Sequence, residues 1–207
     1  MSFAEIAALT IHDVKNSLAQ LAGQAEARGD AATLRIALNA SEALTRLLVF
    51  YKSENNILQL AVDAHVPADL ITELATELVA EHRDVSAISI IVDDTAAPTL
   101  WHYDKTLVRM LLANAIHNAL RFAQTCITIS AREMDGFLEF EVRDDGAGYP
   151  ENVLSDEDGS AAISEQGTGL GLLLAKRVAQ MHENAGQYGE IRLFNDLGAV
   201  FVLRLPS

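Results

Sequence analysis

Apolar residues between positions 7 and 25 recur in alternating steps of four and three, and this spacing constrains the N-terminal part of the chain more than any other feature. The first run comprises Ala7, Ile11, Val14, Leu18, Leu21 and Ala25, and a second run of similar spacing comprises Leu34, Leu38, Ser41, Leu44, Leu48 and Tyr51. Such stripes are typical of helices that pack in the manner of a coiled coil. Between them, "ARGD" at 27–30 offers a glycine at a helix end and an aspartate as the next N-cap. The pattern predicts a helical hairpin over residues 3–58.

Two helices cannot enclose both stripes by themselves, because each helix leaves part of its apolar surface open to water. Two hairpins that pair as a four-helix bundle between two chains would bury these surfaces. The sequence therefore predicts a homodimer.

Beyond residue 58 the chain changes to segments that alternate between the periods of strands and helices. Helices are expected at 67–82, 104–123 and 169–183, and strands at 87–94, 126–134, 137–146, 189–194 and 199–206, with a mobile acidic loop over 149–166. This succession predicts an α+β fold. In it, a helical hairpin (1–58) precedes a two-layer α/β sandwich (59–207) with helices over one face of its sheet.

The charge balance argues against nucleic acid as a partner. The chain carries 29 acidic and 15 basic residues, a formal net charge of -14, whereas a phosphate backbone requires concentrated Lys and Arg. A basic or mixed-charge protein is the expected kind of partner. The single cysteine, Cys126, excludes an internal disulfide and fits a reducing compartment.

The sequence also contains no obvious membrane segment. The N-terminus "MSFAEIAALT" has an acid where a signal peptide needs basic residues, and no apolar run approaches the roughly 20 residues that span a bilayer. We expect a cytoplasmic protein without direct membrane insertion.

Three polar residues lie close to the first stripe, in "LTIHDVKNSLAQL" (9–21). His12 lies about 100 degrees from the stripe, on a flank that faces solvent, and Asn16 lies one turn further along that flank. A neutral imidazole is a competent nucleophile, and the adjacent Asp13 carboxylate can hold its tautomer or accept its proton. An exposed polar flank without chemistry is the alternative.

A pair of asparagines interrupts the apolar helix expected at 104–123. Asn114 and Asn118 lie one turn apart, so their carboxamides project together and offer oxygens to a hard cation or amides to phosphate. Arg121 follows one turn later on a neighbouring face, where it meets either phosphate or solvent. A helix cap or a core edge is the alternative use of the pair.

Glycines follow a strand end in "VRDDGAGYP" (142–150). The carboxylate of Asp144 can accept a hydrogen bond from an exocyclic amine such as that of adenine, and Gly146 and Gly148 allow a ligand to approach the backbone. An ordinary strand-end turn is the alternative for this segment.

A second glycine-rich segment, "GTGLGL" (167–172), opens the last expected helix. Gly167, Thr168, Gly169, Leu170 and Gly171 place free backbone N–H groups at the helix start, which favours phosphate. The G-x-G-x-G spacing follows an acidic loop rather than a strand, so it differs from a dinucleotide fingerprint.

In this order, the four stretches resemble the motif boxes of bacterial two-component sensor histidine kinases. "HDVKNSL" resembles the H box, "NAIHNALRF" the N box, "DDGAGY" the G1 box and "GTGLGL" the G2 box. The resemblance covers almost the whole chain. It implies a dimerisation and phosphotransfer hairpin (1–58) followed by a catalytic ATP-binding domain (59–207) of the type shared with gyrase and MutL.

The resemblance implies roles for the hairpin residues by position. His12 would be the phosphoacceptor and Asp13 its acid/base partner. Asn16 would help to position water for the dephosphorylation of a partner regulator. An ATP-dependent protein-histidine kinase of this kind autophosphorylates its histidine and passes the phosphoryl group to an aspartate on a response-regulator receiver domain.

The resemblance likewise implies ATP and Mg²⁺ as cofactors. Asn114 and Asn118 would hold Mg²⁺ and phosphates, with Arg121 beside them. Asp144 would bind the adenine amine in a pocket shaped by Gly146 and Gly148, and the loop from Gly167 to Gly171 would lie against the phosphates.

The start of the chain bears on how a signal would arrive. Only 11 residues precede His12, too few for an input module. We therefore expect sensor input from a separate protein or from a domain outside this sequence.

Three features of the sequence depart from the family's pattern. Ser17 stands where the family commonly has proline, which removes the usual helix kink after the H box. The segment 149–166 contains no phenylalanine, so the F box is missing, and "GAVF" at 198–201 has alanine where many members carry Thr or Ser. None of these changes removes a direct phosphate or metal ligand, so we expect slow turnover rather than none.

Two other functions fit parts of the same pattern. A histidine phosphotransferase relay protein has the same architecture but accepts phosphate without using ATP; such proteins typically have eroded nucleotide boxes, and those here are intact. An ATPase of the gyrase class needs a glutamate base on the N-box helix, where Ala113 and His117 flank the asparagines instead.

Overall fold

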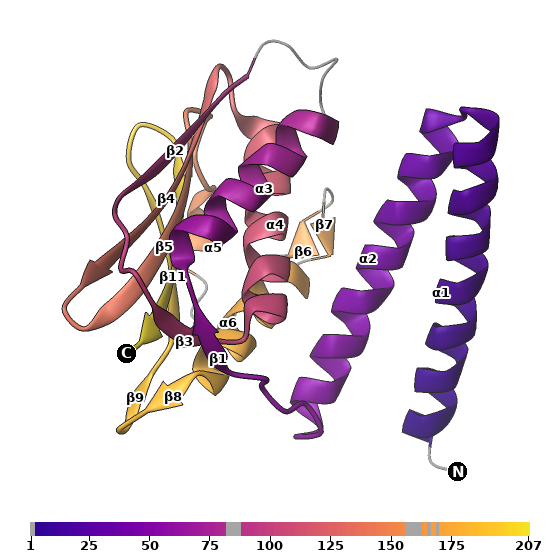
Figure 1. Cartoon of the computed structure of the whole chain (residues 1–207), viewed down its shortest axis with the longest axis horizontal. Helices are drawn as coiled ribbons and strands as arrows, with labels where there is room; N and C mark the ends of the chain where they lie inside the picture. Colours follow the sequence, from indigo (N-terminus) through magenta and orange to yellow (C-terminus); the bar gives the residue numbers. More distant parts are fainter. Residues whose placement is uncertain (1–2, 82–87, 156–162, 165–166, 169) are drawn as a thin grey trace. The chain divides into compact units, whose positions relative to one another are not determined.

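The chain divides into two compact units, Met1–Leu58 and Gln59–Ser207 (Figure 1). The computed structural model describes residues 3–81, 88–155, 163–164, 167–168 and 170–207. None of the helices in this described part combines the length and apolar character that crossing a bilayer requires.

Two long helices make up the first unit. α1 (Phe3–Arg28) and α2 (Ala31–Glu54) pack against each other as a hairpin. Gly29, between them, has a φ of +68°, a left-handed conformation that glycine adopts without a Cβ clash. Asp30 caps α2, because its Oδ1 accepts a hydrogen bond from Thr33 N at 3.0 Å and its Oδ2 accepts one from Thr33 Oγ1 at 2.6 Å. The helices and their turn lie where the two stripes and "ARGD" predict them.

The hairpin has a small core of its own. Among the side chains that the structure describes here, which begin at residue 10, the buried apolar ones are the alanines Ala22, Ala25 and Ala37. Large apolar side chains remain exposed on both helices: Val14 and Leu21 on α1, and Ile36, Leu38 and Leu47 on α2. Alanine side chains allow the helices to approach closely but bury little apolar area, so the hairpin keeps substantial apolar surface in contact with water.

A five-stranded sheet forms the centre of the second unit, in the order β10-β11-β5-β4-β2. The strands are β2 (Ser89–Ala96), β4 (Cys126–Met134), β5 (Phe137–Asp144), β10 (Glu190–Asn195) and β11 (Ala199–Pro206). β2 pairs with β4 in parallel, and the other neighbours are antiparallel. This sheet carries Asp144 at the end of β5.

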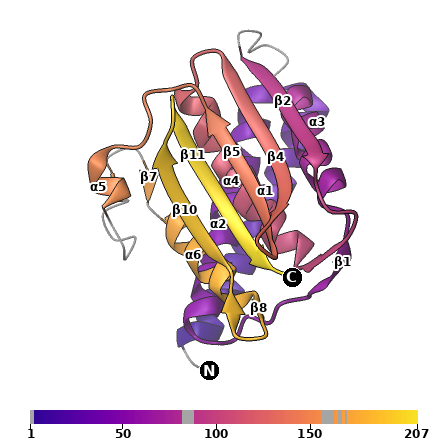
Figure 2. The ribbon, with the colours of Figure 1, turned by 90° about the vertical axis from the view of Figure 1, so that its left-hand side faces the viewer.

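Three helices cover one face of the sheet, as Figure 2 shows: α3 (Pro67–Glu81), α4 (Lys105–Phe122) and α6 (Leu170–Met181). Apolar side chains of these helices and of the covered sheet face form the core, among them Leu70, Ile71, Leu112, Ile116, Ile129, Leu138, Phe140, Leu174 and Leu203. The mixed α and β sandwich expected from the sequence is confirmed for this unit.

Several short elements are not predicted from the sequence. The segment 149–166, expected to be a mobile loop, contains α5 (Glu151–Leu154), because Pro150 and an acidic first turn favour a helix start. It also contains β6 (Ile163–Ser164), which pairs with β7 (Gly167–Thr168). That expectation is therefore wrong for these parts, and residues 156–162 and 165–166 lie outside the described residues.

Two further pairs of short strands and several boundaries also differ from expectation: the strand expected to end at residue 146 ends at Asp144, and the helix expected to end at residue 183 ends at Met181. β1 (Asp63–His65) pairs with β3 (Trp101–Tyr103), and β8 (Glu183–Asn184) pairs with β9 (Gln187–Tyr188). These runs of two or three residues are too short for a period to be recognised. β2 continues to Ala96, beyond the expected end at residue 94, and residue 87 lies outside the described part of the chain.

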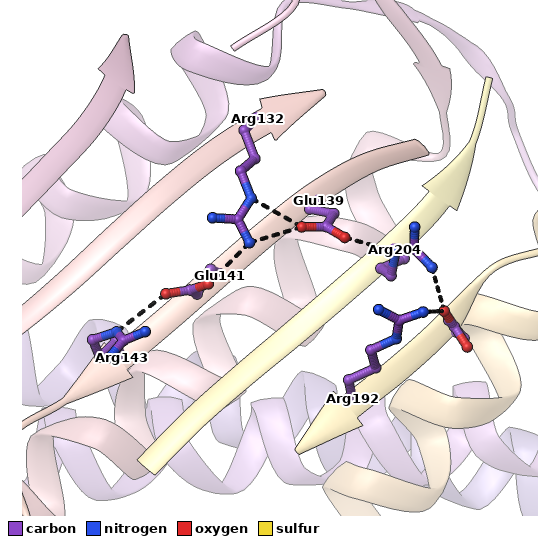
Figure 3. Close-up of polar contacts among 7 residues, drawn as sticks. Arg132, Glu139, Glu141, Arg143, Arg192 and Arg204 are labelled. Atoms are coloured by element: carbon purple, nitrogen blue, oxygen red, sulfur yellow. Dashed lines mark hydrogen bonds and ion pairs between the residues drawn. The ribbon is translucent and has the colours of Figure 1, made fainter. Parts of the chain in front are cut away.

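The other face of the sheet carries a ladder of charged side chains (Figure 3). Arg204 on β11 pairs with Glu139 on β5 at 2.7 Å and with Glu190 on β10 at 2.6 Å, and Glu139 also accepts from Arg132 Nε at 2.9 Å. Glu139 and Arg204 are buried although none of the three covering helices lies on this face, and the Arg204 guanidinium lies 4.3 Å from the centre of the Phe137 ring. Paired charges thus connect β4, β5, β11 and β10 across this face of the sheet.

Candidate functional site

Asp144, the last residue of β5, lies buried at the end of this central strand of the sheet. Its Oδ1 accepts hydrogen bonds from Gly146 N at 2.8 Å and from Ala199 N at 3.3 Å. Within the part of the chain that the structure describes, no hydrogen bond engages Oδ2. One carboxylate oxygen is therefore fixed by backbone N–H groups, while the other remains available to accept from a ligand donor such as an amine.

Two glycines make this position of Asp144 possible. A Cβ on Gly146 would lie 2.3 Å from the carbonyl oxygen of Phe122, so only glycine lets the chain after β5 pass the end of α4. Gly198 has a φ of +153°, and its Cβ would lie 1.8 Å from the carbonyl oxygen of Asp144. The sequence analysis names Gly146 but not Gly198. Its place in a short turn before the last strand is the signal that points to it.

Gly148 lies against Asn195, a residue that the sequence analysis does not name as a site residue. It has a φ of +83°, and a Cβ there would lie 2.7 Å from Cγ of Asn195. Oδ1 of Asn195 accepts a hydrogen bond at 2.7 Å from the backbone N–H of Tyr149, the residue after Gly148. Burial raises the pKa of the Tyr149 hydroxyl, and the negative charge of Asp144 raises it further. The tyrosine is therefore neutral beside the candidate site.

Asp145, next to Asp144, acts on the backbone rather than on a ligand. Its carboxylate accepts hydrogen bonds from Gln124 N at 2.7 Å and from both the hydroxyl and the backbone N–H of Thr125. These bonds, chiefly that of the Thr125 hydroxyl, hold the pKa of Asp145 well below its usual range. Of the two adjacent aspartates, Asp145 ties β5 to the connection between α4 and β4, which leaves Asp144 for a ligand.

The asparagine pair on α4 has two different environments. Asn114 is half-buried, and a Cβ on Gly171 would lie 2.4 Å from its Nδ2. Gly171 therefore lets the first turn of α6 approach Asn114, which brings the N-box and G2-box segments together. Asn118, one turn further along α4, is exposed.

The remaining predicted residues are placed in part. Arg121 is exposed near the end of α4, with Cζ 5.4 Å from the centre of the Phe122 ring. Leu170 is the first residue of α6 and is half-buried. Gly167 and Thr168 form β7, whereas Gly169 lies outside the described residues. The role expected for each of these residues at the phosphates stays a prediction.

In the helical unit, His12 lies on an exposed flank of α1, as the sequence predicts. Its imidazole is 71% exposed, and Asp13 beside it is 83% exposed. Asn16 Nδ2 lies 3.2 Å from His12 Nδ1, and Asp13 Oδ1 lies 3.9 Å from the same nitrogen. α1 continues through Ser17, whose hydroxyl donates to the Asp13 carbonyl at 3.0 Å. Both polar contacts of the ring fall on Nδ1.

The asparagine pair on α4 is the candidate ligand set for a cation at the α/β unit. Among the described residues, no three His, Cys, Asp or Glu side chains come together in a way that could hold a metal ion. The carboxamide oxygens of Asn114 and Asn118 are hard, neutral donors, which suits Mg²⁺ shared with phosphate oxygens. This donor set fits the ion that the sequence resemblance implies.

Comparison with known proteins gives one family match and a set of similar proteins. Residues 103–207 match the family described as histidine kinase-, DNA gyrase B-, and HSP90-like ATPase. The chain is 38% identical over 112 residues to signal transduction histidine-protein kinase AfsQ2 of Streptomyces coelicolor. The matched residues make up 50% of this chain and 20% of that protein. It is 32% identical over 153 residues to the sensor-like histidine kinase SenX3 of Mycolicibacterium smegmatis, covering 66% of this chain and 38% of that protein.

The fold also has solved counterparts. The crystal structure of full-length ShkA in complex with AMPPNP matches with a TM-score of 0.75 and 22% sequence identity, over 99% of this chain and 46% of that one. At this identity the likeness concerns the fold. The chain spans less than half the length of each of these three proteins.

Proposed function

Because the chain belongs to the family of histidine kinase-, DNA gyrase B- and HSP90-like ATPases, we propose that it is an ATP-dependent protein-histidine kinase. It phosphorylates His12 and passes the phosphoryl group to an aspartate on a response-regulator receiver domain. Both curated relatives compared above are named as histidine kinases, which supports this choice within the family.

The observation that carries the proposal is the placement of His12. The family includes ATPases that transfer no phosphoryl group to protein, and a phosphoacceptor histidine distinguishes a kinase from them. His12 is 71% exposed on a helix flank, with Asp13 and Asn16 facing one of its nitrogens. The N-box helix carries Ala113 and His117 beside its asparagines rather than the glutamate base expected of a gyrase-class ATPase.

The contacts at Nδ1 suggest how the imidazole becomes a nucleophile. A half-turn of the Asn16 amide presents its oxygen instead of its nitrogen to Nδ1, so that Nδ1 keeps its proton and the lone pair is on Nε2. Nε2 then attacks the γ-phosphorus of ATP, a P–N bond forms as the P–O bond to ADP breaks, and the proton on Nδ1 passes to Asp13 or to water.

The α/β unit supplies the nucleotide site in this proposal. Oδ2 of Asp144 accepts from the adenine amine, while Oδ1 stays bound to backbone N–H groups. Asn114 and Asn118 would hold Mg²⁺, whose charge stabilises the phosphates, and Gly171 keeps the start of α6 close to Asn114. The neighbour of similar fold was solved with AMPPNP bound, which supports a nucleotide ligand here.

We also propose that the hairpins pair in a homodimer. The exposed apolar side chains of α1 and α2, including Val14, Leu21 and Leu38, would be buried in a four-helix bundle. Sedimentation of the protein should give a dimer, and Leu38→Glu should shift it toward monomer. A wild-type monomer at micromolar concentration would contradict the bundle.

The runner-up is a relay protein that receives phosphate from a receiver domain without ATP. A time course distinguishes the two functions: the protein is incubated with γ-labelled ATP, and label is followed onto a purified receiver domain. The kinase labels itself first and the receiver second. Failure to take label from ATP, combined with label acquired from a phosphorylated receiver, would establish the relay protein instead.

Asn16 is proposed to hold water in line with an aspartyl phosphate on the docked receiver, which is an orienting role because its carboxamide is not a base. In the same assay, Asn16→Ala should slow loss of phosphate from the receiver and spare labelling of His12. Equal effects on both steps would indicate a structural role.

A further inference from the structure

The turn between β10 and β11, residues 195–198, contacts the segment Asp144–Tyr149 at both of its ends. We call this turn the clasp turn. Its first residue, Asn195, pairs in register with Ala199, and Ala199 N is one of the two groups that hold Asp144 Oδ1. The clasp turn is therefore continuous with the support of the proposed adenine-binding carboxylate.

At the far end of the segment, the side chain of Asn195 binds the backbone of Tyr149 twice. Asn195 Oδ1 accepts from Tyr149 N at 2.7 Å, and Asn195 Nδ2 donates to the Tyr149 carbonyl at 2.9 Å. The carboxamide thus pairs with both backbone groups of one residue, as a residue of a neighbouring strand would. Gly148 completes the fit, because a Cβ there would lie 2.7 Å from the Asn195 carboxamide.

At the near end, the next residues of the turn hold the end of β5. Arg143 Nη1 donates to Asp196 at its carbonyl oxygen, 3.0 Å away, and at Oδ2, 2.6 Å away. Gly198 lies against the Asp144 carbonyl so closely that no side chain fits between them. Three residues of the clasp turn, Asn195, Asp196 and Gly198, therefore hold the segment that carries Asp144 at its two ends.

The backbone of the clasp turn indicates that these contacts, and not local preference, set its shape. Leu197 has a φ of +56°, which is unfavourable for a leucine, and its side chain is 95% exposed, so packing does not compensate. Such an outlier persists where the surrounding contacts determine the conformation.

We propose that Asn195 is a positioning residue for nucleotide binding: it fixes the Asp144–Tyr149 segment so that Asp144 Oδ2 meets the adenine amine. This inference rests on the proposed function, because it assumes that the segment binds a nucleotide. Asn195 itself does not touch the ligand.

Two measurements on the full chain test the role. The first is hydrogen exchange of the Tyr149 amide without ligand, and the second is calorimetric binding of a non-hydrolysable ATP analogue with Mg²⁺. In Asn195→Ala, exchange at Tyr149 should accelerate and the dissociation constant should rise, each by about tenfold, since loss of one or two neutral hydrogen bonds changes an equilibrium by roughly this factor. Asn195→Asp keeps the acceptor for Tyr149 N but sets a carboxylate oxygen against the Tyr149 carbonyl in place of the donor, so it should not restore either measurement to the wild-type value.

Leu197→Asn is the matched control, because asparagine tolerates the left-handed backbone and position 197 makes no contact in the clasp. It should leave both measurements unchanged. Faster Tyr149 exchange with an unchanged dissociation constant in Asn195→Ala would overturn the positioning role while leaving the proposed function intact. Absence of nucleotide binding by the wild type, with normal protection of the Tyr149 amide, would overturn the proposed function and the positioning role with it.

Discussion

The candidate residues of the helical hairpin and those of the α/β unit are held in different ways. His12, Asp13 and Asn16 are exposed, and the contacts of the imidazole are with the other two. Asp144 is 6% exposed and bound by two backbone N–H groups, and Gly171 lies against Asn114. Substitution of one of these exposed hairpin residues should therefore change chemistry with little effect on packing, whereas substitution of Asp144 or Gly171 should change both.

The largest effect on stability is expected where polar groups are buried in the α/β unit. Arg204→Met keeps most of the side-chain volume but leaves Glu139, which is 3% exposed, with Arg132 as its remaining ion pair. Breaking a buried pair in this way should lower the free energy of unfolding by about 3 kcal/mol, measured by urea denaturation.

Arg192→Met is the matched control on the same sheet face. Arg192 is 51% exposed and pairs with Glu190, so its loss should change stability by less than about 1 kcal/mol. Equal losses in the two variants would contradict the distinction between buried and exposed charges.

Glycine-to-alanine changes should have opposite signs in the two units. Gly171→Ala places a Cβ 2.4 Å from Asn114 Nδ2, so Asn114 must move; we expect a loss of about 1–2 kcal/mol and weaker nucleotide binding. Gly23→Ala, inside α1 with no atom within 4 Å of the new Cβ, should stabilise by about 0.5–1 kcal/mol. Thermal unfolding of both variants measures the contrast, and two shifts of the same sign would contradict it.

A buried histidine should make the α/β unit sensitive to acid. His182 Nε2 accepts from Asp104 N at 3.1 Å and Nδ1 donates to the Val178 carbonyl at 2.9 Å, and burial lowers its pKa from the ordinary value. The unfolded chain then binds the proton more readily than the folded one. The stability contributed by neutral His182 is present above pH about 6.5 and is lost as the pH falls toward the lowered folded-state pKa.

Chemical denaturation between pH about 5 and about 7 should show this slope in the wild type, and His182→Gln should reduce it. An identical slope in the two proteins would assign the acid sensitivity to other groups.

The parts of the molecule that the sequence predicts are those determined by neighbours along the chain. The stripes predict α1 and α2, and period-two alternation with the intervening turn predicts β4 and β5 as a hairpin. In the same way, spacing within single segments identifies Asp144 and the asparagine pair. Each of these features is determined by residues that lie close together in the sequence, within one helix, one strand or one hairpin.

The features that the sequence does not predict depend on partners far along the chain. Asn195 binds Tyr149, 46 positions away, and His182 binds Asp104, 78 positions away. Position 198 must be glycine because any Cβ there would meet the Asp144 carbonyl, and these two residues become neighbours only when the sheet has formed. An isolated asparagine or histidine gives no periodic signal, and the turn before the last strand marks Gly198 as a turn residue without indicating which backbone it meets.

The smallest effect on stability is expected at the centre of the proposed chemistry. His12→Ala removes an exposed side chain from a helix flank, so the free energy of unfolding should change by less than about 0.5 kcal/mol. Binding of an ATP analogue should also be unchanged. A large loss of stability in His12→Ala would mean that the hairpin flank has a structural role.

The identity of the labelled residue tests the account most directly. Wild type and His12→Ala are incubated with γ-labelled ATP and Mg²⁺, and the label is mapped by its acid lability and by mass spectrometry of the peptide that contains residue 12. We predict acid-labile phosphate on His12 in the wild type and no label in the variant. Acid-labile label that persists in His12→Ala, or that maps to another residue of the wild type, would contradict the assignment of His12 as the phosphoacceptor.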